Sequence, residues 1–242
     1  EFRRVLFRSN DTVSYEDKSV AVTVDFKNNI ATGDGTDTLN SIENAIGGSA
    51  KDKFLMAEDN MANTINGKGD TDTISYEYYV NSGVRVNLST TLAQIVVDNL
   101  TGTDDTDTIL EIENIIGSTK NDIFIGSSGA NTISGGEGTD TFIAGTDSNN
   151  DGVLDTWAND GSDYFDGGSG TGDWIDYSII TDDSNSGTNG LSLTLDGANI
   201  AIATVRGGST DSILNVENVS GTQDSDNIKG DNQNNTIYIN II

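Results

Sequence analysis

The stretch Gly117–Ile143 divides without remainder into three nonapeptides, GSTKNDIFI, GSSGANTIS and GGEGTDTFI. Glycines let a turn take positive φ and leave its carbonyl oxygens uncovered. The last three residues of each unit form a minimal strand with one apolar side chain directed inward. Two units therefore make one coil of a solenoid, and the sixth-position residues Asp122 and Asp140, two units apart, are predicted to stack on the same side. Asn131 is predicted to lie on the opposite side.

The same register occurs in three parts of the chain. Its sixth-position residues follow the order Glu–Asp–Asn–Asp, with Glu43, Asp52, Asn63 and Asp72, then Glu113, Asp122, Asn131 and Asp140, then Glu217, Asp226 and Asn235. The first copy has a two-residue insertion near Met56–Ala57, and Lys68 and Asp70 replace two of its turn glycines. An order that recurs in separate copies indicates a structural register.

Two sequence markers define a larger module. The marker T-D-T-x-x-x-x-E-N begins at Thr36 and Thr106 and recurs as TDSILNVEN at Thr210; a second marker, DTVSYE, DTISYE or DWIDYS, contains Tyr15, Tyr76 and Tyr177. We interpret these tyrosines as packing residues of the modules. Between the markers lie alternating apolar stretches, VAVTVDF, VRVNL and LSLTLDG, which predict strands with one buried face.

These patterns predict an all-β chain, in which solenoid segments are interrupted by inserted strands or hairpins. Module 1 is expected at residues 10–75 and module 2 at residues 76–143, while residues 144–242 hold an insertion and a truncated module 3. Residues 1–9, EFRRVLFRS, match no later repeat and have the character of read-through from a foreign sequence. We exclude them from the fold and expect the chain to be a fragment.

Composition excludes several classes of function. The net charge is -27 with 28 glycines and no proline, cysteine or histidine. Nucleic acid and anionic membrane surfaces are excluded as partners by this charge. Thiolate nucleophiles and histidine-based triads are excluded by composition. No apolar run reaches the roughly 18 residues of a membrane span. Paired carboxylates can hydrolyse glycosides, but these acids belong to a repeated pattern, so we predict that the chain is not an enzyme.

The unit Gly135–Ile143 fits the pattern G-G-x-G-x-D-x-U-x, where U is a large apolar residue, at every fixed position. It resembles the hemolysin-type calcium-binding (RTX) repeats of large bacterial secreted proteins, and degraded or intact copies cover most of Asp11–Ile239. The resemblance implies a parallel β-roll, export by type I secretion and folding outside the cell. It also implies that sixth-position aspartates and turn carbonyls bind Ca²⁺. On this chain the implied ligands are Asp122 and Asp140 with the turn at Gly136 and Gly138, and then Asp52, Asp72 and Asp226.

An insertion adds further candidate ligands. Asp147, Asn149, Asp151 and Asp155 provide oxygen side chains at loop positions 1, 3, 5 and 9, with Gly152 at position 6, as in an EF-hand or thrombospondin type 3 loop. Ala158 stands where an EF-hand has its bidentate glutamate. Asp163 and Asp173 end two further turns. The alternative for Asp147–Asp155 is an Asx-rich solvated loop. The alternative for the other turns is a polar solenoid without metal, in which Asn63, Asn131 and Asn235 form an amide ladder.

The sequence therefore predicts a repeat region that folds on binding several Ca²⁺ ions, in a secreted bacterial protein outside the cell or at its surface. An adhesin stalk is the favoured role, with an extracellular surface or glycan as the target of missing parts of the parent protein. The alternatives are the carrier region of a secreted hydrolase or toxin, whose catalytic domain lies elsewhere, and a metal-free acidic solenoid.

Overall fold

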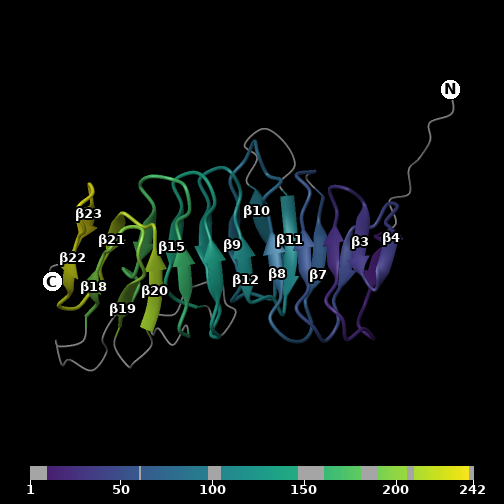
Figure 1. Ribbon diagram of the computed structural model, residues 1–242, viewed down its shortest axis with the longest axis horizontal. Coiled ribbons are helices and arrows are strands. Elements are labelled where there is room, and N and C mark those ends of the chain that lie inside the picture. Colours follow the sequence, from purple (N-terminus) through teal and green to yellow (C-terminus); the bar gives the residue numbers. More distant parts are fainter. Residues whose placement is uncertain are drawn as a thin grey trace.

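A computed structural model describes residues 10–59, 61–97, 105–146, 161–180, 190–205 and 210–239. Figure 1 shows an elongated stack of coils, with the N-terminal and C-terminal coils at opposite ends. The regular elements of this part of the chain are all β-strands, which confirms the predicted class. None of its segments is a helix able to cross a membrane.

The strands are short, as expected when each unit of the repeat contains one turn and one strand. Their bounds are β1 Thr12–Ser14, β2 Thr23–Asp25, β3 Ile30–Gly33, β4 Gly35–Thr38, β5 Asn44–Ile46, β6 Lys53–Leu55, β7 Asn63–Asn66, β8 Thr73–Ser75, β9 Arg85–Asn87, β10 Gln94–Val97, β11 Asp105–Leu110, β12 Asn114–Ile116, β13 Ile123–Ile125, β14 Thr132–Ser134, β15 Thr141–Ile143, β16 Tyr164–Asp166, β17 Trp174–Asp176, β18 Ser192–Thr194, β19 Ala201–Thr204, β20 Thr210–Leu214, β21 Asn218–Ser220, β22 Asn227–Lys229 and β23 Thr236–Tyr238.

Within the runs β4–β9, β11–β18 and β20–β23, successive strands alternate between two faces of a parallel β-roll. One face is a sheet in the order β22-β18-β19-β20-β16-β14-β12-β8-β6-β2-β3-β4, and the other consists of the sheets β1-β5-β7-β11-β10 and β23-β21-β17-β15-β13-β9. Strands one coil apart pair in parallel: β13 pairs with β15, which aligns Phe124 with Phe142. The parallel roll implied by the repeat is therefore confirmed.

The core is a narrow stack of the single inward side chains. Phe124 and Phe142 lie with ring centroids 5.6 Å apart, and Phe165 continues the stack 5.4 Å beyond Phe142. All three are at most 1% exposed. Burying one such side chain contributes roughly 1.5–3 kcal/mol, so each coil gains only a small hydrophobic stabilisation.

Each module also inserts one antiparallel strand into the roll, as predicted. β3 lies between β2 and β4, and β19 lies between β18 and β20. β10 pairs with β11. On its other side, β10 is joined to β9 by the side chain of Gln94. The Asn87 N–H donates to Gln94 Oε1 at 2.7 Å, and Gln94 Nε2 donates to the Asn87 carbonyl at 2.9 Å.

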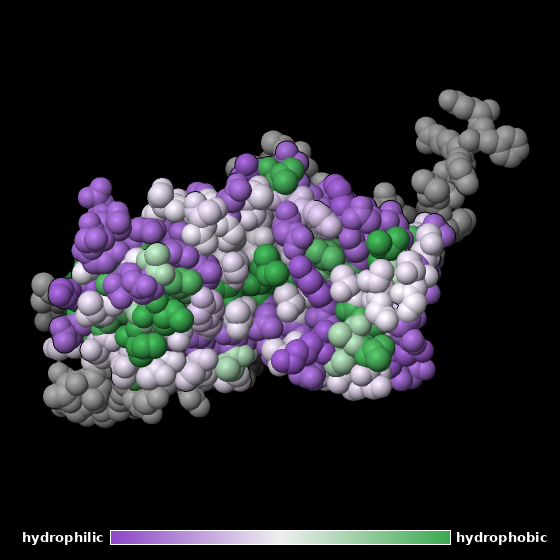
Figure 2. Space-filling model, viewed as in Figure 1, coloured by the Kyte–Doolittle hydropathy of each residue, from purple (hydrophilic) through white to green (hydrophobic). Residues whose placement is uncertain are grey.

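Polar residues cover much of the surface, and Figure 2 shows them interrupted by separate apolar patches. Ile200 and Ile202, at the start of β19, are 55% and 52% exposed. The surface therefore combines a large negative charge with only scattered apolar side chains.

Candidate metal centre

The sixth-position aspartates form a hydrogen-bonded column along one edge of the roll. The backbone N–H of Asp122 donates to Asp140 Oδ1 at 2.8 Å, and the N–H of Asp140 donates to Asp173 Oδ1 at 2.7 Å. All three side chains are at most 1% exposed. The predicted stacking of Asp122 on Asp140 is confirmed, and Asp173 extends the column despite the extra residue in its turn.

The second oxygen of several column carboxylates has no partner within the described part of the chain. These buried atoms are Oδ2 of Asp72, Asp140, Asp173 and Asp226. Leaving a buried acceptor unsatisfied costs about 1–3 kcal/mol, and more for a charged group. A bound cation would compensate this cost, so these oxygens mark where an ion would be stabilised.

The glycines that begin the turns leave space beside these oxygens. A Cβ added at Gly67, Gly135, Gly167 or Gly221 would collide with the carboxylate that ends the same turn, at Asp72, Asp140, Asp173 or Asp226. Glycine is therefore required for the carboxylate to fold back over its own turn. This is a physical reason for the glycine–aspartate spacing that the sequence shows.

Backbone carbonyls supply further oxygen atoms. Gly136 and Gly138 have φ of +104° and +125°, and a Cβ at either position would collide with the carbonyl of Ser118 or Lys120 in the preceding turn. In the described residues no group of three or more acidic side chains is placed to hold a metal. An ion between turns would therefore combine carboxylate and carbonyl oxygens, the hard ligands that Ca²⁺ prefers.

The column is electrostatically unfavourable without a cation. Burial, followed by the charges of Asp122 and Asp173, raises the pKa of Asp140 to about 8. Burial likewise raises the pKa of Asp122 to about 6 and that of Asp173 to about 6. On the other edge, burial raises the pKa of Asp72 to about 7, and the charge of Asp52 adds to the shift. These carboxyls resist ionisation together in the metal-free roll.

Asn131 lies on the opposite edge, before β14 of the larger sheet, as predicted. That edge is not free of acids, however, because the Asn131 N–H donates to Asp163 Oδ1 at 2.8 Å. Asp52 and Asp72 occupy the same edge, where the Asp52 N–H donates to Asp72 Oδ1 at 2.7 Å. Candidate metal-facing acids therefore lie on both edges of the roll. The two edges differ locally, turn by turn.

The remaining predicted ligands fall into two groups. Asp226 is half-buried before β22, where its Oδ1 accepts the Leu191 N–H at 2.8 Å and the Thr222 hydroxyl at 2.6 Å. The loop residues Asp147, Asn149, Asp151 and Asp155 lie outside the described residues, so the EF-hand-like loop remains a prediction.

Sequence reasoning missed two kinds of support for the columns. Ser118 donates its N–H to Asp122 Oδ2 at 2.6 Å and its hydroxyl to Asp122 Oδ1 at 2.7 Å. Lys68 and Asp70 take φ of +72° and +73°, so the first-copy turn keeps positive φ without its glycines. Serine after the first glycine of GSTKND was a usable signal, but the conformation of Lys68 was not predictable from its side chain.

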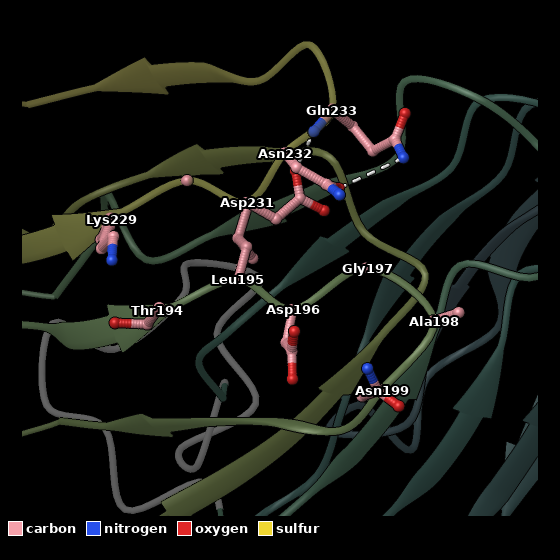
Figure 3. A pocket seen from close by; sticks show the side chains of 11 residues that line it. Thr194, Leu195, Asp196, Gly197, Ala198, Asn199, Lys229, Asp231, Asn232 and Gln233 are labelled. Atoms are coloured by element: carbon pink, nitrogen blue, oxygen red, sulfur yellow. Dashed lines mark hydrogen bonds between the residues drawn. The ribbon is translucent and has the colours of Figure 1, made fainter.

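A separate polar pocket lies near the C-terminal end of the roll. It is lined by residues 194–199 and 229–233, and Figure 3 shows the carboxylates of Asp196 and Asp231 on different loops. Neither residue occupies a sixth position, so the pocket is distinct from the carboxylate columns.

Comparison with known families agrees with this geometry. The family described as "RTX calcium-binding nonapeptide repeat (4 copies)" matches residues 115–150 and 217–238. These segments contain Asp122 and Asp140 of one edge, and Asp226. A search of curated proteins found no match. The chain therefore carries RTX calcium-binding nonapeptide repeats in these two segments, as an RTX repeat protein does.

Proposed function

We propose that the chain is a repeat region that Ca²⁺ folds, exported by type I secretion as part of a bacterial extracellular protein. RTX nonapeptide repeats bind calcium, which supports the coarser function. The observation that carries the proposal is the pair of buried oxygens, Asp140 Oδ2 and Asp173 Oδ2, that have no hydrogen-bond partner in an aligned column.

The proposed ligands are adjacent carboxylates of one edge together with turn carbonyls. Asp122, Asp140 and Asp173 would hold ions on one edge, with carbonyls from the turn containing Gly136 and Gly138. Asp52 and Asp72 would do so on the other edge, where Asp163 also lies. Asp226 and the loop Asp147–Asp155 are further proposed positions. Bound calcium supplies positive charge there, while the carboxylates keep their Oδ1 atoms on the neighbouring coil.

The switch follows from the charge of the columns. With little calcium, stacked carboxylates repel one another and oppose the compact state. Extracellular calcium sites have dissociation constants of about 10⁻⁴–10⁻³ M. A site held at 100 times its dissociation constant adds roughly 2.7 kcal/mol to the folded state. Several such sites together would couple folding to the external calcium concentration.

Calcium titration followed by far-UV circular dichroism tests the proposal. We expect β-structure to increase with calcium, and a spectrum that is unchanged by chelation would contradict it. Asp140→Ala is expected to raise the calcium midpoint more than Asn131→Ala, because Asn131 has partners without an ion: it accepts the Ser127 N–H at 2.7 Å and donates to the Glu113 carbonyl at 2.8 Å. Equal effects would contradict the assigned ligands.

We further propose a stalk or spacer role in an adhesin, with modules at residues 10–75, 76–143 and 144–242. The repeated acids and the antiparallel strands inserted in each module support a scaffold without catalysis of its own. The second candidate is the carrier region of a secreted hydrolase or toxin, which the family match equally permits. Sequencing the flanking reading frame distinguishes them: adhesin-type repeats favour the stalk, and a protease or lipase motif favours the carrier.

A further inference from the structure

Each module contains a tyrosine hydroxyl bonded to an aspartate on the opposite face of the roll. The tyrosine directly follows β1, β8 or β17, and the aspartate belongs to β4, β11 or β20. The O–H to Oδ2 distances are 2.9 Å for Tyr15–Asp37, 3.3 Å for Tyr76–Asp107 and 2.8 Å for Tyr177–Asp211. β8 and β20 belong to the larger sheet, whereas β11 and β17 belong to the smaller ones. The Tyr76–Asp107 and Tyr177–Asp211 pairs therefore join the two faces through the interior, whereas Asp37 of the first pair is exposed.

The aspartates of the two inner pairs are also held by the neighbouring coil. Asp107 Oδ1 accepts the Asn63 N–H at 3.1 Å, and Asp211 Oδ1 accepts the Asp163 N–H at 3.1 Å. Asp107 is 0% exposed and Asp211 is 2% exposed. Both oxygens of each carboxylate thus have protein donors. In this they differ from Asp140, whose Oδ2 has none.

The glutamate of the T-D-T-x-x-x-x-E-N marker bonds to a neighbouring coil in the same metal-free manner. Glu113 accepts the Asp72 N–H at 2.9 Å, and Glu217 accepts the Asp173 N–H at 3.0 Å. Glu43 accepts the Asp11 N–H at 3.0 Å in the first module. The side chain therefore serves as an acceptor for the preceding coil.

The asparagine of the marker bonds to the following coil. Asn114 Oδ1 accepts the Thr132 N–H at 3.1 Å, and Asn218 Oδ1 accepts the Thr236 N–H at 2.8 Å. The nonapeptide pattern does not account for this marker. Its polar residues form coil-to-coil bonds that need no ion.

We infer that each module junction is a calcium-independent clamp before calcium binds. In it, the Tyr–Asp pair holds the two faces of the roll together, and the glutamate and asparagine of the marker hold neighbouring coils of one face together. The inference rests on the proposed calcium-dependent function, because it divides the roll into clamped junctions and calcium-requiring turns. Without calcium, the pairing of β11 with β7 and of β20 with β16 persists. The turns 117–122, 135–140 and 167–173 open far more often than these junctions under the same conditions. Without calcium the junctions therefore stay folded and keep the strand register, and calcium binding orders the turns between them.

Hydrogen–deuterium exchange of the full chain, read by mass spectrometry with and without calcium, tests the clamp. Amides of residues 106–114 and 210–218 are expected to stay protected in both conditions, and amides of the three turns only with calcium. Tyr177→Phe removes one hydroxyl that bonds to a buried carboxylate. It is expected to speed exchange at residues 210–218 of the calcium-free chain by at least about tenfold. The number of calcium ions bound at saturation should not change.

Tyr164→Phe is the matched control, because Tyr164 lies on the outer side of β16 and its neighbour Phe165 points into the core. It should leave exchange at residues 210–218 unchanged. Tyr76→Phe repeats the test at residues 106–114. Loss of all protection in calcium-free Tyr177→Phe, with refolding on calcium addition, would be the extreme form of the expected effect.

Rapid exchange at both junctions of the calcium-free parent chain would overturn the clamp, even where calcium titration shows binding. So would equal effects of Tyr177→Phe and Tyr164→Phe. A flat calcium titration, by contrast, would overturn the proposed function itself, so the two failures are distinguishable.

Discussion

Asparagine at position 140 should change the stability of the roll in opposite directions with and without calcium. Asp140 is fully buried, and burial together with the charges of Asp122 and Asp173 raises its pKa from 3.8 to about 8. The amide of Asp140→Asn keeps the oxygen that accepts the Asp122 N–H and removes the charge. The substitution therefore separates the hydrogen-bonding role of the side chain from its electrostatic role.

The sign follows from linkage. A carboxyl with a raised folded-state pKa stabilises the fold fully below its unfolded pKa, and this stabilisation is lost as pH rises through the folded pKa. For Asp140 the window runs from about pH 4 to about pH 8. One pKa unit corresponds to about 1.4 kcal/mol, which gives an upper limit of about 5 kcal/mol near pH 7.5. Because the turn can relax toward water, we expect Asp140→Asn to stabilise the calcium-free chain by about 2 kcal/mol there.

With calcium we expect the effect to reverse, because the proposed site would lose one charged ligand. We expect the calcium midpoint to rise about tenfold, equivalent to about 1.4 kcal/mol. Urea unfolding followed by circular dichroism, on calcium-depleted and calcium-saturated samples at pH 4.5 and 7.5, measures both effects. The reasoning is refuted if Asp140→Asn destabilises the calcium-free chain at pH 7.5, or if the variant and the parent show the same pH dependence.

Four further predictions concern single features of the roll. Lys68→Gly should stabilise the chain by about 1 kcal/mol in urea unfolding, because Lys68 has φ of +72°; an unchanged midpoint would contradict this. Phe142→Ala should cost about 3–5 kcal/mol in thermal unfolding, and a loss below about 1 kcal/mol would mean that the aromatic stack does not support the coil. Gly135→Ala should weaken calcium binding because its Cβ meets the Asp140 carboxylate, whereas Gly129→Ala, whose nearest neighbour is 3.7 Å away, should not; equal calcium affinities would refute the steric argument. Lowering pH from 8 to 6 should raise the calcium midpoint because protons compete for Asp140; a midpoint that falls would refute the assignment.

Much of the roll was predictable because the nonapeptide period fixes position directly. Nine residues advance the chain from one face to the other, so Phe124 and Phe142 had to stack and Asp122 had to align with Asp140. Residues close in sequence thus define the register without any knowledge of distant contacts. The period did not reveal, however, that Asp52, Asp72 and Asp163 share the edge of Asn131.

The contacts that could not be predicted are those made between modules or between faces. Tyr76 and Asp107 meet across the interior, and no periodicity relates a tyrosine after one strand to an aspartate within another. Gln94 joins β10 to Asn87 through its side chain, where an alternating pattern predicts only backbone pairing. Such bonds depend on how separate coils pack, so sequence markers indicated their importance without showing their partners.

The alternation of glutamate and asparagine in the columns has a cause that is independent of calcium. The N–H of Glu113 donates to the Asp72 carbonyl at 3.3 Å, and its own carbonyl accepts from Asn131 Nδ2 at 2.8 Å. Glu217 and Asn235 repeat this arrangement at 3.0 Å. A carboxylate in place of Asn131 would place its oxygen, an acceptor, against the Glu113 carbonyl, which is also an acceptor. The residue that follows each glutamate in the column must therefore carry a hydrogen-bond donor.

Aspartate occupies positions where the preceding coil instead offers an N–H, as Asp122 does to Asp140. Oδ1 of each of these acids therefore accepts a backbone N–H of a neighbouring coil, and the roll needs that acceptor whether or not an ion is bound. In Asp140 and Asp173, Oδ2 has no protein donor, whereas Oδ2 of Asp122 accepts the Ser118 N–H. The choice between aspartate and asparagine thus follows first from coil-to-coil hydrogen bonding, and the proposed calcium sites lie where two such aspartates succeed one another beside glycine turns.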